Sequence, residues 1–284
     1  MTAGLALDGL LGRALASGDD ADLRSALVAD SGLPGARLNL RLMSAFAKAV
    51  GSVVSPSDGG SGPPVAALEA LLDGWAALDA EQAPVDQPSV ILPCAAVAAY
   101  GEVGAVRPDW WPDEVRKLRR AAADDRWRVR EVVALALQRL LDADWDRTAA
   151  ELLSWAADKD DPLVVRAAAA GVAEPPLLAA RPARASSAYG VQRRAVETLR
   201  GYPPPDRPTP PVRVLRQALG FTVSVVVAAA GDFTLLHDLA AAGDTDLLWV
   251  ARENLKKSRL ARWPAEVHAV QALLTGQDAF RTQR

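Results

Sequence analysis

The sequence reads DRWRVREVVALALQRL from Asp125 to Leu140, and its apolar residues recur at every third or fourth position. That spacing follows the 3.6-residue turn of an α-helix and gathers the apolar side chains into one continuous stripe. A stripe of this length predicts a helix that packs against other helices. The members of the stripe are Val129, Val132, Val133, Ala136, Leu137 and Leu140.

A second helix is predicted just upstream, over residues 112–123. Trp111 precedes it and Pro112 falls in its first turn, where a proline ring is tolerated because the backbone N–H there has no helical partner. Only Asp124 and Asp125 separate this helix from the next one. Such a short connection predicts an antiparallel helix pair.

The same arrangement recurs further along the chain. Residues 145–158 predict another first helix, Asp160 and Asp161 another turn, and residues 164–173 another second helix. In both pairs an Asp is followed four residues later by Val and five residues later by Arg, so the chain repeats a two-helix unit. The matching triplets are Asp125, Val129 and Arg130, and then Asp161, Val165 and Arg166.

The 36-residue separation of these two arginines, with an Asp in the turn and Val-Arg early in the second helix, resembles the HEAT repeat family. Weaker copies occur at Arg213 and at Asp246, Val250 and Arg252. The resemblance implies an all-α fold, an α-solenoid in which antiparallel helix pairs form a right-handed stack. It also implies a structural ladder along the stacked turns, in which carboxylates cap helices and bind arginines of neighbouring repeats. The ladder residues are Asp125, Arg130, Asp161 and Arg166.

Two regions are expected. Residues 109–284 form the repeat region, and residues 1–108 form an irregular N-terminal helical cap. Within the cap, residues 52–64 contain Ser, Gly and Pro without an apolar period, which predicts a flexible loop. Within the repeat region, residues 202–211 contain six prolines and are expected to run extended between helices. The helices expected in the cap span residues 5–17, 20–30, 36–50, 65–79 and 90–106.

Composition excludes several classes of protein. The formal net charge is −3, with −6 in residues 1–100 and +3 in residues 101–284, so the chain as a whole lacks the basic field of a non-specific nucleic-acid binder. Half of the residues are hydrophobic, which is enough for a packed core. The excess of Ala and of Arg over Lys is typical of a GC-rich bacterial genome.

The single cysteine and the two widely separated histidines argue against a metal site. Cys94 allows no internal disulfide and lies in an apolar helical pattern, which predicts a small buried side chain. His237 and His268 have no neighbouring ligand at metal-binding spacing. No phosphate-binding glycine loop or nucleophile elbow occurs, so no cofactor is expected. Without a signal peptide or an uninterrupted apolar run of about 18 residues, we expect a cytoplasmic protein with no membrane segment.

Two groups of residues are candidates for binding. Arg126, Trp127 and Arg128 begin the second helix of one pair, and a similar Trp-x-x-Arg-Glu sequence starts at Trp249. These tryptophans either pack under the preceding helix or present a stacking surface to a planar or anionic group.

The second group is basic. Arg252, Lys256 and Arg259 follow an i, i+4, i+7 spacing, which predicts either one basic helix face without a neutralising acid or an ordinary solvated face. Arg216 is expected to line the same side of the stack. The pairs Asp113 with Lys117 and Glu253 with Lys257 have the spacing of ordinary helix ion pairs.

Two functions are compatible with these patterns. The first is a binding scaffold whose concave face holds an acidic protein or peptide, with no catalysis. The alternative is a nucleic-acid-binding or repair protein, because alkylpurine DNA glycosylases built from HEAT-like repeats use aromatic side chains and a carboxylate on a basic concave surface. The likeness of this chain to those glycosylases lies in Trp110, Trp111, Asp113, Arg126, Trp127 and Arg128.

Overall fold

The computed structural model describes residues 2–55 and 63–282, and these residues form helices and turns without any strand. The predicted all-α fold is therefore confirmed for the described part of the chain. The chain separates into two compact units, Met1–Asp144 (unit 1) and Trp145–Arg284 (unit 2). The boundary expected after residue 108 falls inside unit 1, between two helices that pack on each other.

Unit 1 is built around one apolar helix, α5, which packs against α2, α3, α4, α6 and α7. Almost every residue of α5 is buried, as expected of a helix that is hydrophobic on all sides. The helices of unit 1 are α1 (Thr2–Ser17), α2 (Ala21–Ala29), α3 (Leu40–Val54), α4 (Pro63–Ala76), the 3₁₀ helix η2 (Pro88–Val90), α5 (Ile91–Val106), α6 (Trp111–Ala122) and α7 (Trp127–Ala143).

Helix α7 contains the apolar stripe found in the sequence. All six members of the stripe are 2% exposed or less, and α7 packs on α5 and α6. The two helices α5 and α7 meet at Gly101, where an added Cβ would lie 2.6 Å from the carbonyl oxygen of Ala136. Only a residue without a side chain allows the two backbones to approach this closely.

The N-terminal helices differ from the sequence prediction at several boundaries. Helix α3 begins at Leu40 rather than near residue 36, because the Asn39 carboxamide caps it by accepting a hydrogen bond from the Leu42 N–H at 3.1 Å. Helix α3 also continues to Val54, and α4 begins at Pro63. The flexible loop predicted over residues 52–64 is therefore helical at both ends, and its centre, residues 56–62, lies outside the described residues.

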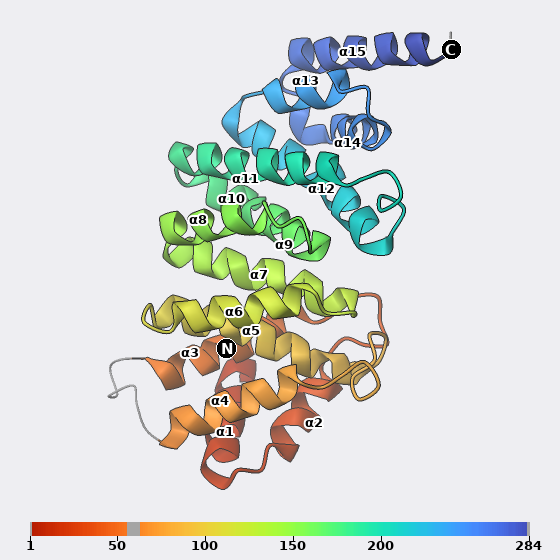
Figure 1. Ribbon diagram of the computed structural model, residues 1–284. Helices are drawn as coiled ribbons and strands as arrows, with labels where there is room; N and C mark the ends of the chain where they lie inside the picture. The colour runs from red at the N-terminus through yellow and green to blue at the C-terminus, as the bar shows by residue number, and fades with distance from the viewer. Residues whose placement is uncertain (1, 56–62, 283–284) are drawn as a thin grey trace. The chain divides into compact units, whose positions relative to one another are not determined.

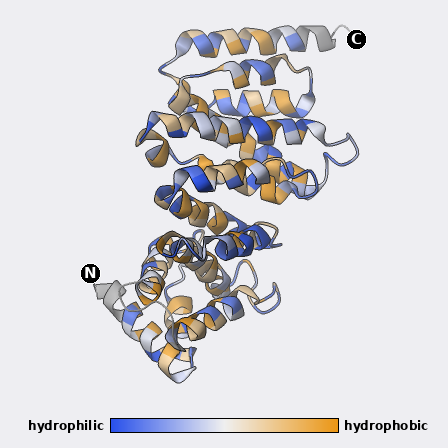
Figure 2. Ribbon diagram, turned by 60° about the vertical axis from the view of Figure 1, so that its left-hand side comes forward, coloured by the Kyte–Doolittle hydropathy of each residue, from blue (hydrophilic) through white to orange (hydrophobic). Residues whose placement is uncertain are grey.

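In unit 2, helices pack mainly on helices one to three positions away in the chain (Figure 1). Helix α12 contacts α9, α11 and α14, and α13 contacts α14 and α15. The ribbons carry hydrophobic and hydrophilic residues side by side, as expected of helices with one buried face (Figure 2). The helices are α8 (Trp145–Trp155), α9 (Pro162–Val172), α10 (Pro175–Ala179), α11 (Pro182–Gly201), α12 (Pro210–Ala230), α13 (Thr234–Ala241), α14 (Thr245–Leu255), the 3₁₀ helix η3 (Ser258–Leu260) and α15 (Pro264–Thr282).

Neutral polar side chains join the buried helices of unit 2. The carboxamide of Gln192 in α11 donates to the Ala169 carbonyl of α9 at 2.7 Å and accepts from the Thr222 hydroxyl of α12 at 3.0 Å. Gln192 is fully buried, so these bonds satisfy groups that water cannot reach. Gln192 thus connects three helices, α9, α11 and α12.

Asn254 in α14 makes the next connection. Its amide donates to the carbonyls of Leu219 and Val250, each at 2.8 Å, and its carbonyl oxygen accepts from the Ser224 N–H at 2.7 Å. Asn254 is also fully buried. The sequence analysis missed these residues because it searched for charged ladder residues, although polar residues at otherwise apolar positions are a readable signal.

The proline-rich segment between α11 and α12 is folded into turns instead of the extended run that was expected. The Asp206 N–H donates to the Pro203 carbonyl, and the Thr209 N–H donates to the Asp206 carbonyl, each at 3.0 Å. Arg207 fixes the segment, because its guanidinium donates to the carbonyls of Tyr202 and Arg200 at 3.0 Å. It also pairs with Asp244 and Asp246 before and within α14.

Two helices among the described residues are long and apolar enough to cross a membrane, by length and composition alone: residues 88–106 and α12. Neither satisfied the sequence criterion of an uninterrupted apolar run of about 18 residues, because polar residues interrupt both. About 72% and 61% of their most apolar windows are buried within the protein. Mostly buried core helices pass the same test, so the finding is weak evidence for a membrane.

Candidate functional site

The predicted cap at Asp161 is confirmed. Its carboxylate accepts hydrogen bonds from the Leu163 N–H at 2.9 Å and the Val164 N–H at 3.3 Å, the first free donors of α9. Arg166, the matching ladder arginine, is 7% exposed. Arg166 is therefore buried in the helix pair, and Asp161 is half-buried in the turn that it caps.

In the first pair the predicted cap is missing, because the N-cap residue of α7 is Arg126 and no side chain caps the helix. Asp125 is exposed and makes no cap hydrogen bond, whereas the carboxylate of Asp124 accepts from the Arg126 N–H at 2.7 Å. Arg130 donates to the carbonyls of Asp124 and Asp125, at 2.5 and 2.8 Å. Arg130 therefore holds its own turn together, and its predicted ladder contact with a neighbouring repeat stays a prediction. The cap predicted at Asp125 was wrong.

Arg126 does not line a binding surface, contrary to the prediction. It is 5% exposed, its Nε and Nη2 pair with Asp124 at 2.9 and 2.7 Å, and its Nη1 donates to the carbonyls of Asp79 and Ala83. Arg126 therefore links the start of α7 to the connection between α4 and α5.

Trp127 and Arg128 remain closer to solvent. The Trp127 side chain is 48% exposed, and the Arg128 guanidinium lies over its ring at 4.4 Å from the ring centroid. The Arg128 Nε also donates to the Val85 carbonyl at 2.8 Å. Arg128 therefore helps to hold the same connection as Arg126, and only Trp127 keeps the exposure that the binding hypothesis required.

Arg216 and Trp249 form a pair in unit 2. The Arg216 guanidinium lies 4.7 Å from the centroid of the Trp249 ring, and its Nη1 pairs with Asp246 at 2.5 Å. The Trp249 ring packs on α12 at Gly220, where an added Cβ would lie 2.9 Å from the ring. Arg216, which was expected to line the binding side of the stack, is therefore paired with a carboxylate, and Trp249 packs against α12.

The predicted basic helix face does not exist, because α14 ends at Leu255. Arg252 lies in the last turn of α14, Lys256 follows its end, and Arg259 belongs to η3, so the three residues do not share one helix. Lys256 is also neutralised by Glu253 at 2.5 Å, in place of the predicted pairing of Glu253 with Lys257.

The chain that leaves α14 instead makes a compact aromatic and basic surface around Phe221 of α12, here called the Phe221 surface. The Phe221 side chain is 48% exposed. The Lys257 Nζ lies 5.5 Å and the Arg259 guanidinium 4.3 Å from the ring centroid. Arg259 also approaches the Ser224 hydroxyl at 3.5 Å, and burial lowers the pKa of its guanidinium. No carboxylate among the described residues pairs with Lys257 or Arg259.

Arg262 extends this surface along α12. Its Nη2 donates to the Ala228 carbonyl at 2.8 Å, and its guanidinium stacks on the neighbouring Trp263 ring at 4.0 Å. Residues 256–263 contain four cations and no acidic residue. Once Glu253 has neutralised Lys256, three positive charges remain at the Phe221 surface.

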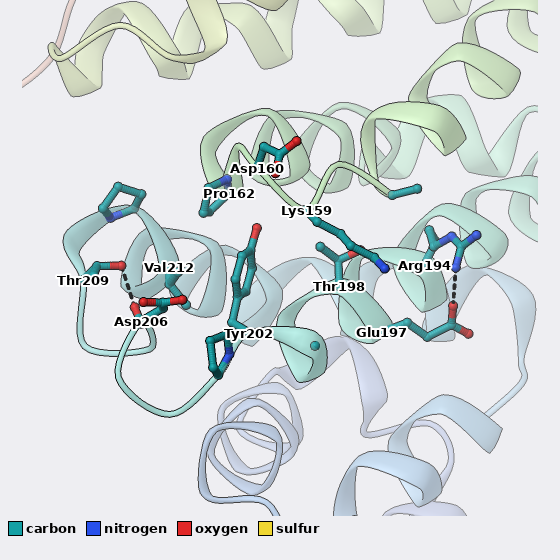
Figure 3. A pocket seen from close by; sticks show the side chains of 14 residues that line it. Lys159, Asp160, Pro162, Arg194, Glu197, Thr198, Tyr202, Asp206, Thr209 and Val212 are labelled. Carbon is teal, nitrogen blue, oxygen red and sulfur yellow. Dashed lines mark hydrogen bonds and ion pairs between the residues drawn. The ribbon is translucent and has the colours of Figure 1, made fainter.

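A second feature of unit 2 is an open cleft of about 930 Å³, here called the Tyr202 cleft. Its walls come from the turn between α8 and α9, the end of α11, the proline-rich segment and the start of α12. Figure 3 shows Tyr202 standing in the cleft, with its hydroxyl toward Pro162 and Asp160. Arg194 and Glu197 pair at 3.1 Å on one side, and Asp206 lies on the other.

The environment of Tyr202 is acidic. Its hydroxyl is buried and has no hydrogen-bond partner. Burial and, to a smaller extent, the negative charges of Asp158, Asp161 and Asp160 together raise the pKa of Tyr202 to about 12. The sequence analysis passed over Tyr202 because it is a lone aromatic residue among prolines, and nothing in its immediate sequence indicates a cleft.

Unit 1 contains a buried ionisable cluster. Glu114 is 3% exposed and contacts Lys117 at 3.2 Å, while its second carboxylate oxygen has no partner. Burial raises the pKa of Glu114 to about 7, although the positive charge of Lys117 opposes the shift. Lys117 also binds Asp73, so the predicted pairing of Lys117 with Asp113 was wrong, and Asp113 pairs with Arg116.

Cys94 is fully buried in α5, as predicted, and burial raises the pKa of its thiol to about 12. A thiol that stays protonated near neutral pH is a poor nucleophile and a poor metal ligand. Among the residues that the structure describes, no three His, Cys, Asp or Glu side chains are grouped so that they could hold a metal ion.

The comparisons with known proteins gave no relative. No family model, curated protein or solved structure matches the chain. A function for this protein has to be argued from its own residues.

Proposed function

We propose that the protein is a HEAT-like repeat protein, a right-handed stack of antiparallel helix pairs, that binds an acidic segment of a partner protein. The Phe221 surface is the proposed binding site. The observation that carries this proposal is the half-exposed Phe221 ring with two cations over it and no acidic residue pairing with either cation.

Repeated capping supports the repeat architecture. The Asp161 carboxylate caps α9 through the second and third residues that follow it, and the Asp244 carboxylate caps α14 through Asp246 and Leu247 at the same two positions. In each case the aspartate ends the turn between the two helices of a pair. The cap in the later copy is thus Asp244, two residues before the Asp246 that the sequence pattern singled out.

The chemistry of the Phe221 surface supports an acidic partner. Lys257 and Arg259 carry charges that no carboxylate of the described chain balances, so a glutamate or aspartate side chain would supply the missing counter-charge. The exposed Phe221 ring offers an apolar contact beside those charges. A segment that alternates acidic and apolar side chains satisfies both features.

The test uses the full chain and a fluorescein-labelled peptide with alternating Glu and Phe residues. Fluorescence anisotropy should show saturable binding that weakens as salt rises, because exposed charge pairs are screened. Arg259→Ala and Lys257→Ala should each weaken binding about twofold to fivefold, the effect of one solvent-exposed ion pair. Phe221→Ala should weaken it by a similar factor.

Lys256→Ala is the matched control, because Lys256 is the adjacent cation and is already neutralised by Glu253. It should leave peptide affinity almost unchanged. Equal losses for Lys256→Ala and Lys257→Ala would mean that bulk charge, and not the Phe221 surface, binds the peptide. Tighter binding of a labelled DNA duplex than of the peptide, with a steep salt dependence, would favour the nucleic-acid alternative.

A further inference from the structure

Lys117 of α6 is shared between two carboxylates of unit 1. Its Nζ lies 3.2 Å from the Oε1 of Glu114 on its own helix and 3.1 Å from the Oδ1 of Asp73 on α4. The same ammonium group lies 4.7 Å from the centroid of the Tyr100 ring of α5, and the Tyr100 hydroxyl donates to Asp73 at 2.8 Å. One positive charge therefore links α6 to both α4 and α5.

The two carboxylates differ in their access to water. The Glu114 side chain is 4% exposed and its Oε2 has no hydrogen-bond partner, whereas the Asp73 side chain is 55% exposed. Water can hydrate an ionised Asp73, but an ionised Glu114 depends on Lys117 for its counter-charge. The protonation state of Glu114 therefore decides which carboxylate needs the lysine more.

The other groups around Glu114 disfavour its ionised form. Glu69 and Asp73 act on it from α4, Tyr100 is the titratable group on the α5 side, and α7 meets the Glu114 Cβ with an apolar side chain. Burial and, to a smaller extent, the charges of Asp73 and Glu69 outweigh the effect of Lys117 and raise the pKa of Glu114 to about 7. Glu114 thus changes its charge near neutral pH.

We propose that Lys117 is a pH-operated latch that holds α4 on α6 while Glu114 is protonated and releases α4 when Glu114 ionises. In the protonated state the ammonium group balances Asp73 across the two helices. In the ionised state it turns to the buried Glu114 carboxylate, whose negative charge also repels Glu69 and Asp73. A cavity of about 340 Å³, bordered by Asp73, Tyr100 and Lys117, gives the lysine side chain room to move.

Release of the latch loosens α4 without unfolding it. Helix α4 keeps its packing on α1, α3 and α5, and it keeps the hydrogen bond from Tyr100 to Asp73. The interaction that is lost is the partly exposed ion pair of Lys117 with Asp73. The loss of one such pair shifts a local opening equilibrium about twofold to fivefold.

Hydrogen–deuterium exchange of the full chain, read by mass spectrometry, tests the latch. The exchange is measured at about pH 6 and about pH 8, on either side of the pKa of Glu114, with times scaled for the pH dependence of the chemical exchange rate. Peptides within residues 65–76 of α4 should lose protection about twofold to fivefold from the lower to the higher pH, relative to peptides within residues 130–142 of α7.

Three variants identify the groups involved. Glu114→Gln keeps the buried position neutral, so the protection of α4 should not change with pH. Asp73→Asn removes the α4 end of the latch at an exposed position, so the protection of α4 should be low already at the lower pH and stay low. Asp113→Asn is the matched control, because Asp113 is an exposed carboxylate of α6 that pairs with Arg116, and it should retain the full pH dependence.

Two results would overturn the proposal. One is a parent chain in which α4 and α7 lose protection equally, or in which neither loses any. The other is a pH dependence of α4 that survives in Asp73→Asn, where the substituted side chain is largely exposed. Because the latch belongs to unit 1 and its test does not involve the Phe221 surface, its failure leaves the proposed function standing, and the reverse also holds.

Discussion

Replacing Asn254 by alanine should destabilise unit 2 by about 2 to 4 kcal/mol. The Asn254 carboxamide makes three hydrogen bonds, to Leu219, Val250 and Ser224, and its side chain is fully buried. A buried hydrogen bond contributes about 1 kcal/mol net, and each partner left unpaired adds a desolvation penalty of about 1 to 3 kcal/mol. The lower value counts the three lost hydrogen bonds and allows the surrounding groups to relax partly. The upper value adds the desolvation penalty of one backbone group that is left unpaired.

The chain provides its own control, because Asn39 is its only other asparagine. Asn39 is half-buried and makes two hydrogen bonds at the start of α3, so Asn39→Ala should cost only about 1 kcal/mol, the usual value of a helix cap. Urea unfolding followed by far-UV circular dichroism measures both free energies. Equal destabilisation by the two variants would refute the argument that Asn254 joins α12 to α14.

Three further predictions follow from particular contacts. Leu137→Ala should lower the free energy of unfolding by about 2 to 5 kcal/mol, because Leu137 is fully buried. Leu135→Ala should lower it by under about 1 kcal/mol, because Leu135 is 41% exposed. Similar values for the two variants in urea titration would show that the α7 stripe is misplaced. Glu114 has its pKa raised from 4.5 to about 7, so the folded state binds more protons than the unfolded state in that window, and stability falls as pH rises through it. The free energy of unfolding of Glu114→Gln, measured relative to that of the parent chain, should therefore increase as the pH rises from 4.5 to 7. A difference between the two chains that stays constant in urea unfolding across that range would contradict the raised pKa. Arg207→Ala should speed proteinase K cleavage within residues 202–209, because the ion pair of Arg207 with Asp244 holds that segment in place. Mass spectrometry of the fragments measures the cleavage rate, and an unchanged rate would show that this ion pair does not protect the segment.

Individual helices and one helix cap could be predicted because their sequence signals are periodic or local. The α7 stripe and the Asp161 cap depend on residues within one or two turns of each other, and local sequence determines such features. The all-helical character follows from the same patterns. These are the parts of the structure that agree with the sequence analysis.

The binding residues were harder to predict because their surroundings come from distant segments. Arg126 is buried by carbonyls more than forty residues earlier in the chain, and no local pattern marks that contact. The end of α14 at Leu255 was missed because Lys256, Lys257 and Ser258 are tolerated in helices and no Gly or Pro follows until Pro264. The prediction therefore placed Arg252, Lys256 and Arg259 on one helix, although the helix ends at Leu255.

The buried hydrogen bonds of Gln192, Thr222 and Asn254 join α9, α11, α12 and α14 through amides and hydroxyls, whereas the ion pair of Arg216 with Asp246 lies nearer the surface. An ionic ladder would weaken as its carboxylates are protonated, whereas the bonds of Gln192, Thr222 and Asn254 involve no titrating group. Being fully buried, Gln192 and Asn254 are also beyond the reach of screening ions. The contacts between these helices should consequently persist from dilute buffer to concentrated salt, and changes in acidity or ionic strength should act first on the charged groups at the surface of the unit.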